Sequence, residues 1–141
     1  MMMKLNILFL ILFVLTVIPL NSFGQVTLSI EINQLRNNNG QVLLEFNNEK
    51  GERIMGITQK IVDAKCTIVI KNLTPGKYAF KYFHDENNNN DIDVNWLGIP
   101  KEGYGFSNDA NGTFGPPPFK KMIFEIKGDT ILKYVPNYIT F

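Results

Sequence analysis

Apolar and polar residues alternate in short runs from residue 26 onward, and turn residues separate the runs. In the first run, residues 26–33, every second side chain is apolar, which is the period of a strand with one buried face. Residues 41–47 repeat this pattern, and the Asn39-Gly40 pair before them favours a tight hairpin. We therefore expect these two strands to pair as a hairpin.

A second pair of alternating runs covers residues 65–73 and 77–84. Between them, Pro75 and Gly76 have the order of the central positions of a type II turn, because proline fixes the first φ and glycine accepts the positive second one. These runs predict two further strands joined by that turn.

Two closing strands are predicted at residues 119–127 and 130–139. Residues 48–64 are less regular and fit either a short helix or an irregular crossing segment. No pattern of crossover helices separates the strands, which excludes a parallel α/β fold. We predict an all-β fold: a single antiparallel β-sandwich of about seven strands, immunoglobulin-like or transthyretin-like.

Residues 85–118 lack the strand pattern. A connection of about 34 residues is far longer than the usual four to six in a compact domain, so such loops are either functional or disordered. Disordered segments are poor in aromatic residues, whereas this one holds Trp96, Tyr104, Phe106 and Phe114. We expect one long, ordered, functional loop.

The first 24 residues have the order of a secretory signal peptide. A basic residue precedes the apolar run 5–20, and the small residues Ser22 and Gly24 fit signal peptidase, which predicts cleavage before Gln25. The alternative is a retained membrane anchor, but a proline interrupts the apolar run before it reaches the length of a spanning helix. The expected location is extracytoplasmic, periplasmic or secreted, with no stable membrane anchor after cleavage.

Charge is balanced in the remaining β-sandwich domain, residues 25–141. The chain has 141 residues with 14 basic and 13 acidic side chains, and Lys4 is the one charged residue of the signal segment. A neutral domain has no electrostatic footprint for nucleic acid or for an anionic membrane. The expected partner is therefore a glycan, a peptide or an envelope protein. Cys66, the single cysteine, alternates with apolar neighbours and is expected to be a buried small hydrophobe.

Four blocks of residues stand out by their unusual composition. They read Leu-Thr-Pro-Gly-Lys-Tyr-Ala at 73–79, Phe-His-Asp-Glu-Asn-Asn-Asn at 83–89, Trp-Leu-Gly-Ile-Pro-Lys-Glu-Gly-Tyr-Gly-Phe-Ser-Asn at 96–108 and Phe-Gly-Pro-Pro-Pro-Phe at 114–119. Together these blocks resemble a bacterial family known as domain of unknown function 2141. The resemblance implies a secreted or periplasmic β-sandwich with no established activity and no catalytic residues to transfer. The first block also resembles, more loosely, transthyretin-like and collagen-adhesin B-type modules.

The chain departs from that family where Asn88 and Asn90 stand in positions commonly held by glycine. Asparagine tolerates the left-handed backbone conformation, so we expect the loop to keep its shape.

Oxygen-bearing side chains occupy alternate positions at the start of the long loop, as in Ca²⁺-binding loops. Position 6 of such a loop is usually glycine and position 12 a bidentate glutamate, whereas this chain has Asn90 and Trp96 there. The alternative is a polar turn in which the side chains accept hydrogen bonds from nearby backbone amides. The predicted ligands are Asp85, Asn87, Asn89, Asp91 and Asp93.

Aromatic residues interspersed with glycines in the same loop are suited to bind a sugar ring or an extended peptide. The alternative is that the aromatics fold inward as the core of the loop itself. The predicted ligand-binding residues are Trp96, Tyr104, Phe106, Asn108 and Phe114.

No catalytic residues are predicted. A nucleophile needs an adjacent base, and His84, the single histidine, is expected to be a structural residue that bonds the loop from a strand end. A hydrolase that uses two carboxylates among Asp85, Asp93 and Glu102 is an alternative, although their spacing singles out no pair.

Two main hypotheses follow. In the first, the protein is a non-catalytic extracytoplasmic module that binds a ligand or partner through residues 85–118, with Ca²⁺ bracing the entry to the loop. In the second, it is a structural or accessory envelope protein whose loop packs on itself.

Overall fold

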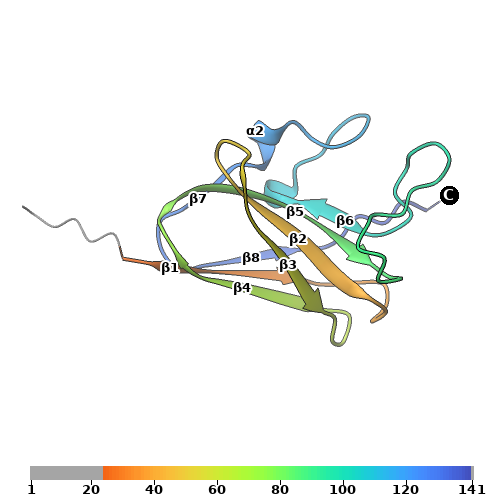
Figure 1. Ribbon diagram of the computed structural model, residues 1–141, viewed down its shortest axis with the longest axis horizontal. Coiled ribbons are helices and arrows are strands. Elements are labelled where there is room, and N and C mark those ends of the chain that lie inside the picture. The colour runs from red at the N-terminus through yellow and green to blue at the C-terminus, as the bar shows by residue number, and fades with distance from the viewer. Residues whose placement is uncertain (1–23, 141) are drawn as a thin grey trace, which may run out of the picture.

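The computed structural model describes residues 24–140, which form two β-sheets packed face to face (Figure 1). The predicted all-β sandwich is therefore confirmed. The predicted signal peptide, residues 1–24, lies outside the described residues except for its last residue. None of the helices in the described part of the chain is long and apolar enough to cross a membrane.

One sheet has three strands and the other five. The three-stranded sheet has the order β4-β1-β8, formed by β4 (Cys66–Leu73), β1 (Val26–Ile32) and β8 (Thr130–Tyr134). The five-stranded sheet is formed by β2 (Gln41–Asn48), β3 (Arg53–Lys60), β5 (Gly76–Asp85), β6 (Tyr104–Phe106) and β7 (Phe124–Ile126). Its order is β3-β2-β5-β6, and β7 pairs with the start of β5. Strands β1 and β8 pair in parallel, while the other pairings between these strands are antiparallel.

The core lies between the sheets, where the alternating residues of the strands meet. Strand β1 alternates buried and partly buried positions, and Ile30 is fully buried. On the facing sheet, Phe80 contacts Tyr134 edge to face, with ring centres 5.1 Å apart. A fully buried side chain of this kind stabilises the fold by roughly 1.5–3 kcal/mol. Cys66 is buried as predicted, and burial raises the pKa of its thiol to about 12.

The predicted hairpin between the first two strands is wrong, because β1 and β2 belong to different sheets. Residues 33–40 cross from one sheet to the other. Leu35 is buried in the core, and its N–H donates to the Ala64 carbonyl at 3.0 Å. Asn39-Gly40 thus ends a crossing segment, which is too long for the two-residue turn that the pair favours in hairpins.

Residues 48–64, predicted as a short helix or an irregular segment, contain edge strand β3 instead. The register of β3 against β2 shifts where Phe46 pairs with Met55 and Asn47 pairs with Arg53. Such a bulge adds a residue to one strand and interrupts its alternation. The pattern of apolar residues around Ile54 therefore did not reveal a strand.

The two predicted closing strands are shorter than expected. Residues 119–127 begin with a single helical turn, α2 (Phe119–Met122), in which Met122 is buried, before β7. Strand β8 ends at Tyr134, two residues before Pro136, which has no N–H to donate to a sheet. Asn137 then exchanges two backbone hydrogen bonds with Tyr104 of the other sheet.

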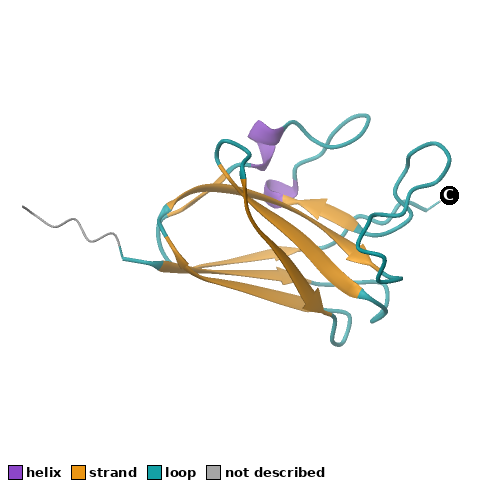
Figure 2. Cartoon of the chain, in the orientation of Figure 1, coloured by secondary structure: helices purple, strands orange, loops and turns teal. Residues whose placement is uncertain are grey.

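The predicted loop 85–118 contains regular structure in its middle. Strand β6 pairs with β5 and leads into η1 (Ser107–Asp109), a turn of 3₁₀ helix. Two loops remain, at residues 86–103 and 110–118, and both project from the sheets (Figure 2). The strand pattern failed here because β6 has only three residues, two of which are aromatic.

Candidate functional site

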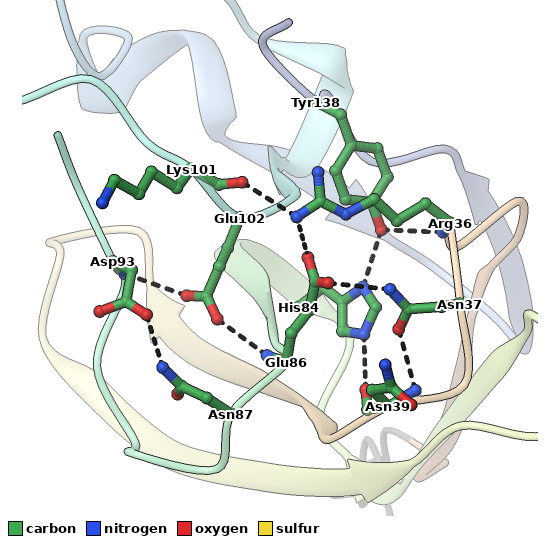
Figure 3. A network of polar contacts seen from close by, with 10 residues as sticks. All are labelled: Arg36, Asn37, Asn39, His84, Glu86, Asn87, Asp93, Lys101, Glu102 and Tyr138. Carbon is green, nitrogen blue, oxygen red and sulfur yellow. Dashed lines mark hydrogen bonds and ion pairs between the residues drawn. The ribbon is translucent and has the colours of Figure 1, made fainter.

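A buried polar network lies at the end of the sandwich where β2 begins and β5 ends (Figure 3). His84 is fully buried, and its Nε2 and Nδ1 lie 2.7 Å from the Asn39 carbonyl oxygen and 2.8 Å from the Tyr138 hydroxyl oxygen. A carbonyl only accepts hydrogen bonds, so Nε2–H donates to Asn39, while Nδ1 bonds the Tyr138 hydroxyl. His84 is packed at the strand end as predicted, but its side chain does not bond the 85–118 loop: it ties the crossing segment to the C-terminal segment.

Arg36 closes this network on its outer side. Its guanidinium forms an ion pair with Glu86, donates to the Lys101 carbonyl at 3.1 Å and lies 4.8 Å from the centre of the Tyr138 ring. Asn37 donates to the second carboxylate oxygen of Glu86 at 2.8 Å. Burial acts to raise the pKa of Glu86, but the hydrogen bonds from Arg36 and Asn37 and the charge of Arg36 together lower it. Glu86 is thereby held in its ionised form.

Glu102 joins the two ends of residues 86–93, the first part of the loop 86–103. Its Oε1 accepts the N–H of Glu86 at 2.8 Å, and its Oε2 accepts the N–H of Asp93 at 3.0 Å. The side chain is buried, and hydrogen bonds to a charged acceptor are stronger than those between neutral groups. Glu102 therefore fixes the separation of the two ends of residues 86–93.

The predicted calcium ligands form a loop that bonds mainly to itself. Asp85 is fully buried, and its carboxylate accepts the N–H groups of Asn89 and Asn90 at 3.1 and 3.0 Å. The amide groups of Asn87 and Asn89 donate to Asp93 at 2.6 and 3.1 Å. Asp91 is exposed and accepts the N–H of the next residue.

This geometry matches the alternative of a polar turn, since these side chains bond nearby backbone amides and one another. Among residues 24–140, no group of three or more His, Cys, Asp or Glu side chains is placed to hold a metal ion. Ca²⁺ would have to recruit the amide oxygens of Asn87 and Asn89 and compete for Asp93. Calcium binding stays a prediction, to be tested by titration.

Asn88 and Asn90 have φ angles of 58° and 63°. Both are therefore in the left-handed region that was expected for residues in glycine positions. Asparagine thus adopts at both positions the backbone conformation that glycine favours.

A short hairpin, residues 93–101, projects beyond this loop. Its tip is held by Asn95, whose N–H donates to the Ile99 carbonyl and whose carbonyl accepts from Gly98, both at 2.9 Å. The Asn95 side-chain oxygen accepts the N–H groups of Leu97 and Ile99 at 2.9 and 3.0 Å. At this tip, Trp96 is 90% exposed and Leu97 is 58% exposed. The hairpin thus presents two apolar side chains on a backbone that is fixed from within.

The other predicted ligand-binding residues do not join Trp96 in one platform. Tyr104 and Phe106 belong to β6 and are partly buried, with ring centres 6.0 Å apart. Asn108 donates to the carbonyls of Lys121 and Ile123, which fixes the end of α2. Phe114 is fully exposed, but it belongs to the second loop.

Two glycines of this region serve the packing of tyrosines. A Cβ at Gly103 would collide with the Tyr138 ring, and one at Gly105 would collide with the Tyr82 ring. At these two positions a tyrosine ring occupies the space beside the backbone that a bound ligand would need.

The three carboxylates considered for hydrolysis are engaged in structure. Each oxygen of Asp85, Asp93 and Glu102 accepts at least one hydrogen bond from a loop amide or a side-chain amide. A general acid or nucleophile needs an oxygen directed at a substrate. The geometry therefore favours a scaffolding role for all three.

Sequence reasoning missed Arg36 and Tyr138 and considered Glu102 only as a catalytic carboxylate. These residues lie far apart in the sequence, and no periodicity or motif connects them. The one signal that pointed to this place was the single buried histidine at a strand end.

A groove of about 410 Å³ lies at the opposite end of the sandwich, where β2 ends and β5 begins. It is lined by residues 48–50 and 74–78 and by Glu125, and it includes none of the predicted site residues.

Comparisons with known proteins place the chain in one family. A family model described as "Uncharacterized protein conserved in bacteria (DUF2141)" matches residues 30–132. The match begins within β1 and ends within β8, so it includes strands of both sheets. No curated protein and no solved structure matches the chain.

Proposed function

The chain belongs to this DUF2141 family of bacterial proteins, and we propose that it is a non-catalytic recognition module that acts outside the cytoplasm. In this proposal, the hairpin of residues 93–101 is the binding element. The polar network behind it is the scaffold that holds the hairpin.

The observation that carries the proposal is the exposure of Trp96 on a rigid tip. Trp96 is the one tryptophan of the chain, and 90% of its surface is open to solvent. Tryptophan is enriched among the residues that contribute most to binding, because it buries a large surface at a small cost in conformational entropy. Asn95 fixes the tip, and the Arg36 bond to the Lys101 carbonyl fixes its base.

Two further parts of the proposal rest on the sequence. The N-terminal segment supports export, with Gln25 as the first residue of the mature chain. The alternating oxygen donors of residues 85–93 support weak Ca²⁺ binding, which would brace the loop behind the hairpin. N-terminal sequencing of the exported protein and a thermal-shift series in millimolar Ca²⁺ test these two parts separately.

The main experiment measures binding to immobilised glycans and peptides by the wild type and by Trp96→Ala. Ile131→Ala is the matched control, since Ile131 is an apolar residue of β8 that is 62% exposed. We expect Trp96→Ala to lose binding by at least about tenfold, as for a residue that dominates an interface. Equal binding by all three proteins would reject the hairpin as the binding element.

A structural or accessory role in the envelope is the second candidate. Its support is the partial burial of Tyr104 and Phe106, which pack within the protein. A co-purifying envelope protein that is retained by Trp96→Ala would favour this candidate.

A further inference from the structure

We propose that the tip of the 93–101 hairpin docks into the interface of a lipid bilayer, with Trp96 and Leu97 at the boundary between headgroups and acyl chains. This inference rests on the proposed function, because it names the partner of the same hairpin. Three features of the tip support it.

The first feature is that the backbone of the tip bonds to itself. Four of the five N–H groups from Asn95 to Ile99 donate to acceptors within the hairpin, those of Asn95, Leu97, Gly98 and Ile99. An exposed loop ordinarily leaves such donors to water. A donor that enters lipid must already be bonded, because acyl chains offer no acceptor. These four donors can therefore leave water at little cost, and a shallow position in the interface leaves the remaining polar groups of the tip in contact with water and headgroups.

The second feature is the distribution of charge around the tip. Residues 94–100 carry no charged side chain, while Val94 and Leu97 are 47% and 58% exposed beside Trp96. Tryptophan prefers the membrane–water interface, where its ring is apolar and its N–H still finds a partner. The exposed side chain of Lys101 follows at the base, where an ammonium group can reach lipid phosphate.

The carboxylate of Asp93, the acidic residue directly before the tip, is directed back into the protein. Asp93 accepts hydrogen bonds from Asn87 and Asn89, so its carboxylate is engaged behind the hairpin. Because the domain as a whole is neutral, no general electrostatic attraction to anionic lipids is expected. Insertion of the apolar tip is the driving force, and zwitterionic lipid is sufficient.

The third feature is the convex shape of the binding element. Trp96 projects from a tip, and Phe114 is fully exposed on the other loop, with the exposed lysines Lys120 and Lys121 following it. A protein partner would need a preformed pocket for a projecting tryptophan, whereas a fluid lipid surface adapts to it. The expected binding is weak and reversible, below the roughly 10⁴ M⁻¹ that a single myristoyl chain provides.

The test uses the exported protein and vesicles of phosphatidylcholine, with the fluorescence of Trp96 as the readout. Since Trp96 is the one tryptophan, its emission reports on this tip alone. We expect a blue shift on adding vesicles and quenching by lipids brominated on the acyl chain. Leu97→Asn should reduce the vesicle-bound fraction by about tenfold, while Ile131→Asn, the same change at a similarly exposed position of β8, should leave it unchanged.

Two outcomes separate this inference from the proposed function. If vesicles cause no blue shift and no quenching, but glycans or peptides bind in a way that Trp96→Ala abolishes, the lipid is the wrong partner and the hairpin is still a binding element. If the wild type and Trp96→Ala bind every glycan and peptide equally, and the wild type shows neither a blue shift nor quenching with vesicles, both proposals are wrong. Equal loss of vesicle binding in Leu97→Asn and Ile131→Asn would also overturn the inference, because the tip would then have no special role.

Discussion

Glu102 shows how one buried side chain can determine the shape of a loop. A buried carboxylate is costly unless its oxygens are bonded, and both oxygens of Glu102 accept backbone N–H groups from the two ends of residues 86–93. The charge is therefore compensated by two dipoles of the loop that it holds. Loop and carboxylate depend on each other, which explains why a nearly inaccessible acid is found at this end of the sandwich.

Replacing Glu102 by glutamine should destabilise the protein. The amide has one acceptor oxygen, so its NH₂ group would face one of the two N–H donors and leave that donor unpaired. We expect a loss of about 1–3 kcal/mol in the free energy of unfolding, measured by urea denaturation. Glu125→Gln is the control, because Glu125 is half exposed and its contact with Lys127 lies on the surface. Equal stability of Glu102→Gln and the wild type would show that the two hydrogen bonds contribute nothing.

Asn88 permits a second test at the level of a single residue. Its φ of 58° lies in the left-handed region, and its side chain is exposed. Alanine should cost about 1–2 kcal/mol there, because Cβ approaches the following carbonyl oxygen in this conformation. Glycine should stay within about 0.5 kcal/mol of the wild type, since it adopts this φ freely. Thermal unfolding of the two variants measures the difference, and a more stable alanine variant would contradict the assigned conformation.

At the level of elements, the hairpin of residues 93–101 behaves as a unit that is fixed mainly by Asn95. The same side-chain oxygen accepts two backbone N–H groups, and the backbone of Asn95 makes two further bonds across the tip. Rigidity of this kind matters for binding because a preordered loop loses less entropy when it meets its partner.

Asn95→Ala should loosen the tip without unfolding the domain. The change removes the acceptor for the N–H groups of Leu97 and Ile99, so we expect faster hydrogen exchange at these two amides and unchanged exchange in the core strands. The midpoint of thermal unfolding should move little, because the tip contributes no buried core residue. Uniform acceleration over the whole domain would instead show that the tip supports global stability.

The regular strands could be predicted from the sequence wherever one face is buried. Strand β1 is an example, since its alternation of apolar residues reflects a two-residue period that the core enforces. Strand β3 could not be predicted, because it is an edge strand with a bulge and has little burial to impose a period. The strands that pair with β1 could not be predicted from a local pattern either, because Asn39-Gly40 is compatible both with a hairpin and with a segment that crosses to the other sheet.

Only part of the site could be predicted from the sequence. The oxygen-rich loop, the histidine at a strand end and Trp96 could be found locally from composition and spacing, whereas the exposure of Trp96 and the roles of Arg36 and Tyr138 could not. The bonds from Tyr138 to His84 and from Arg36 to Glu86 each join residues about 50 positions apart, and the bond from the Arg36 N–H to the Tyr138 hydroxyl joins residues 102 positions apart. Such pairs follow from how the two sheets stack, which no local pattern contains.

At the level of the whole molecule, the polar network links the two sheets at one end. The crossing segment 33–40 follows β1 of the three-stranded sheet, and it contacts His84 and Glu86 at the end of β5 in the other sheet. The C-terminal segment makes the same connection from β8, through Asn137 and Tyr138. The end that carries the hairpin is thereby braced by both sheets. Displacement of the hairpin would therefore be opposed by contacts with segments of both sheets.

The ion pair between Arg36 and Glu86 makes the stability of this brace depend on pH. The folded pKa of Glu86 is lower than its ordinary value of 4.5, so the folded state favours the ionised form. Its contribution to stability is therefore fully present above pH 4.5 and is lost as the pH falls through the lower, folded pKa. The other carboxylates also lose their contributions in acid, so the effect of Glu86 must be isolated by difference.

The measurement compares the wild type with Glu86→Gln by urea denaturation from pH 7 to pH 3. Glutamine keeps the size of the side chain and one acceptor oxygen but cannot ionise, so the stability difference between the two proteins should be constant above pH 4.5 and shrink below it. Titrations of groups that do not interact with Glu86 cancel in this difference. A difference that stays constant to pH 3, or grows in acid, would show that Arg36 does not hold Glu86 in its charged form, and the brace would then depend on the hydrogen bonds of His84 and Tyr138.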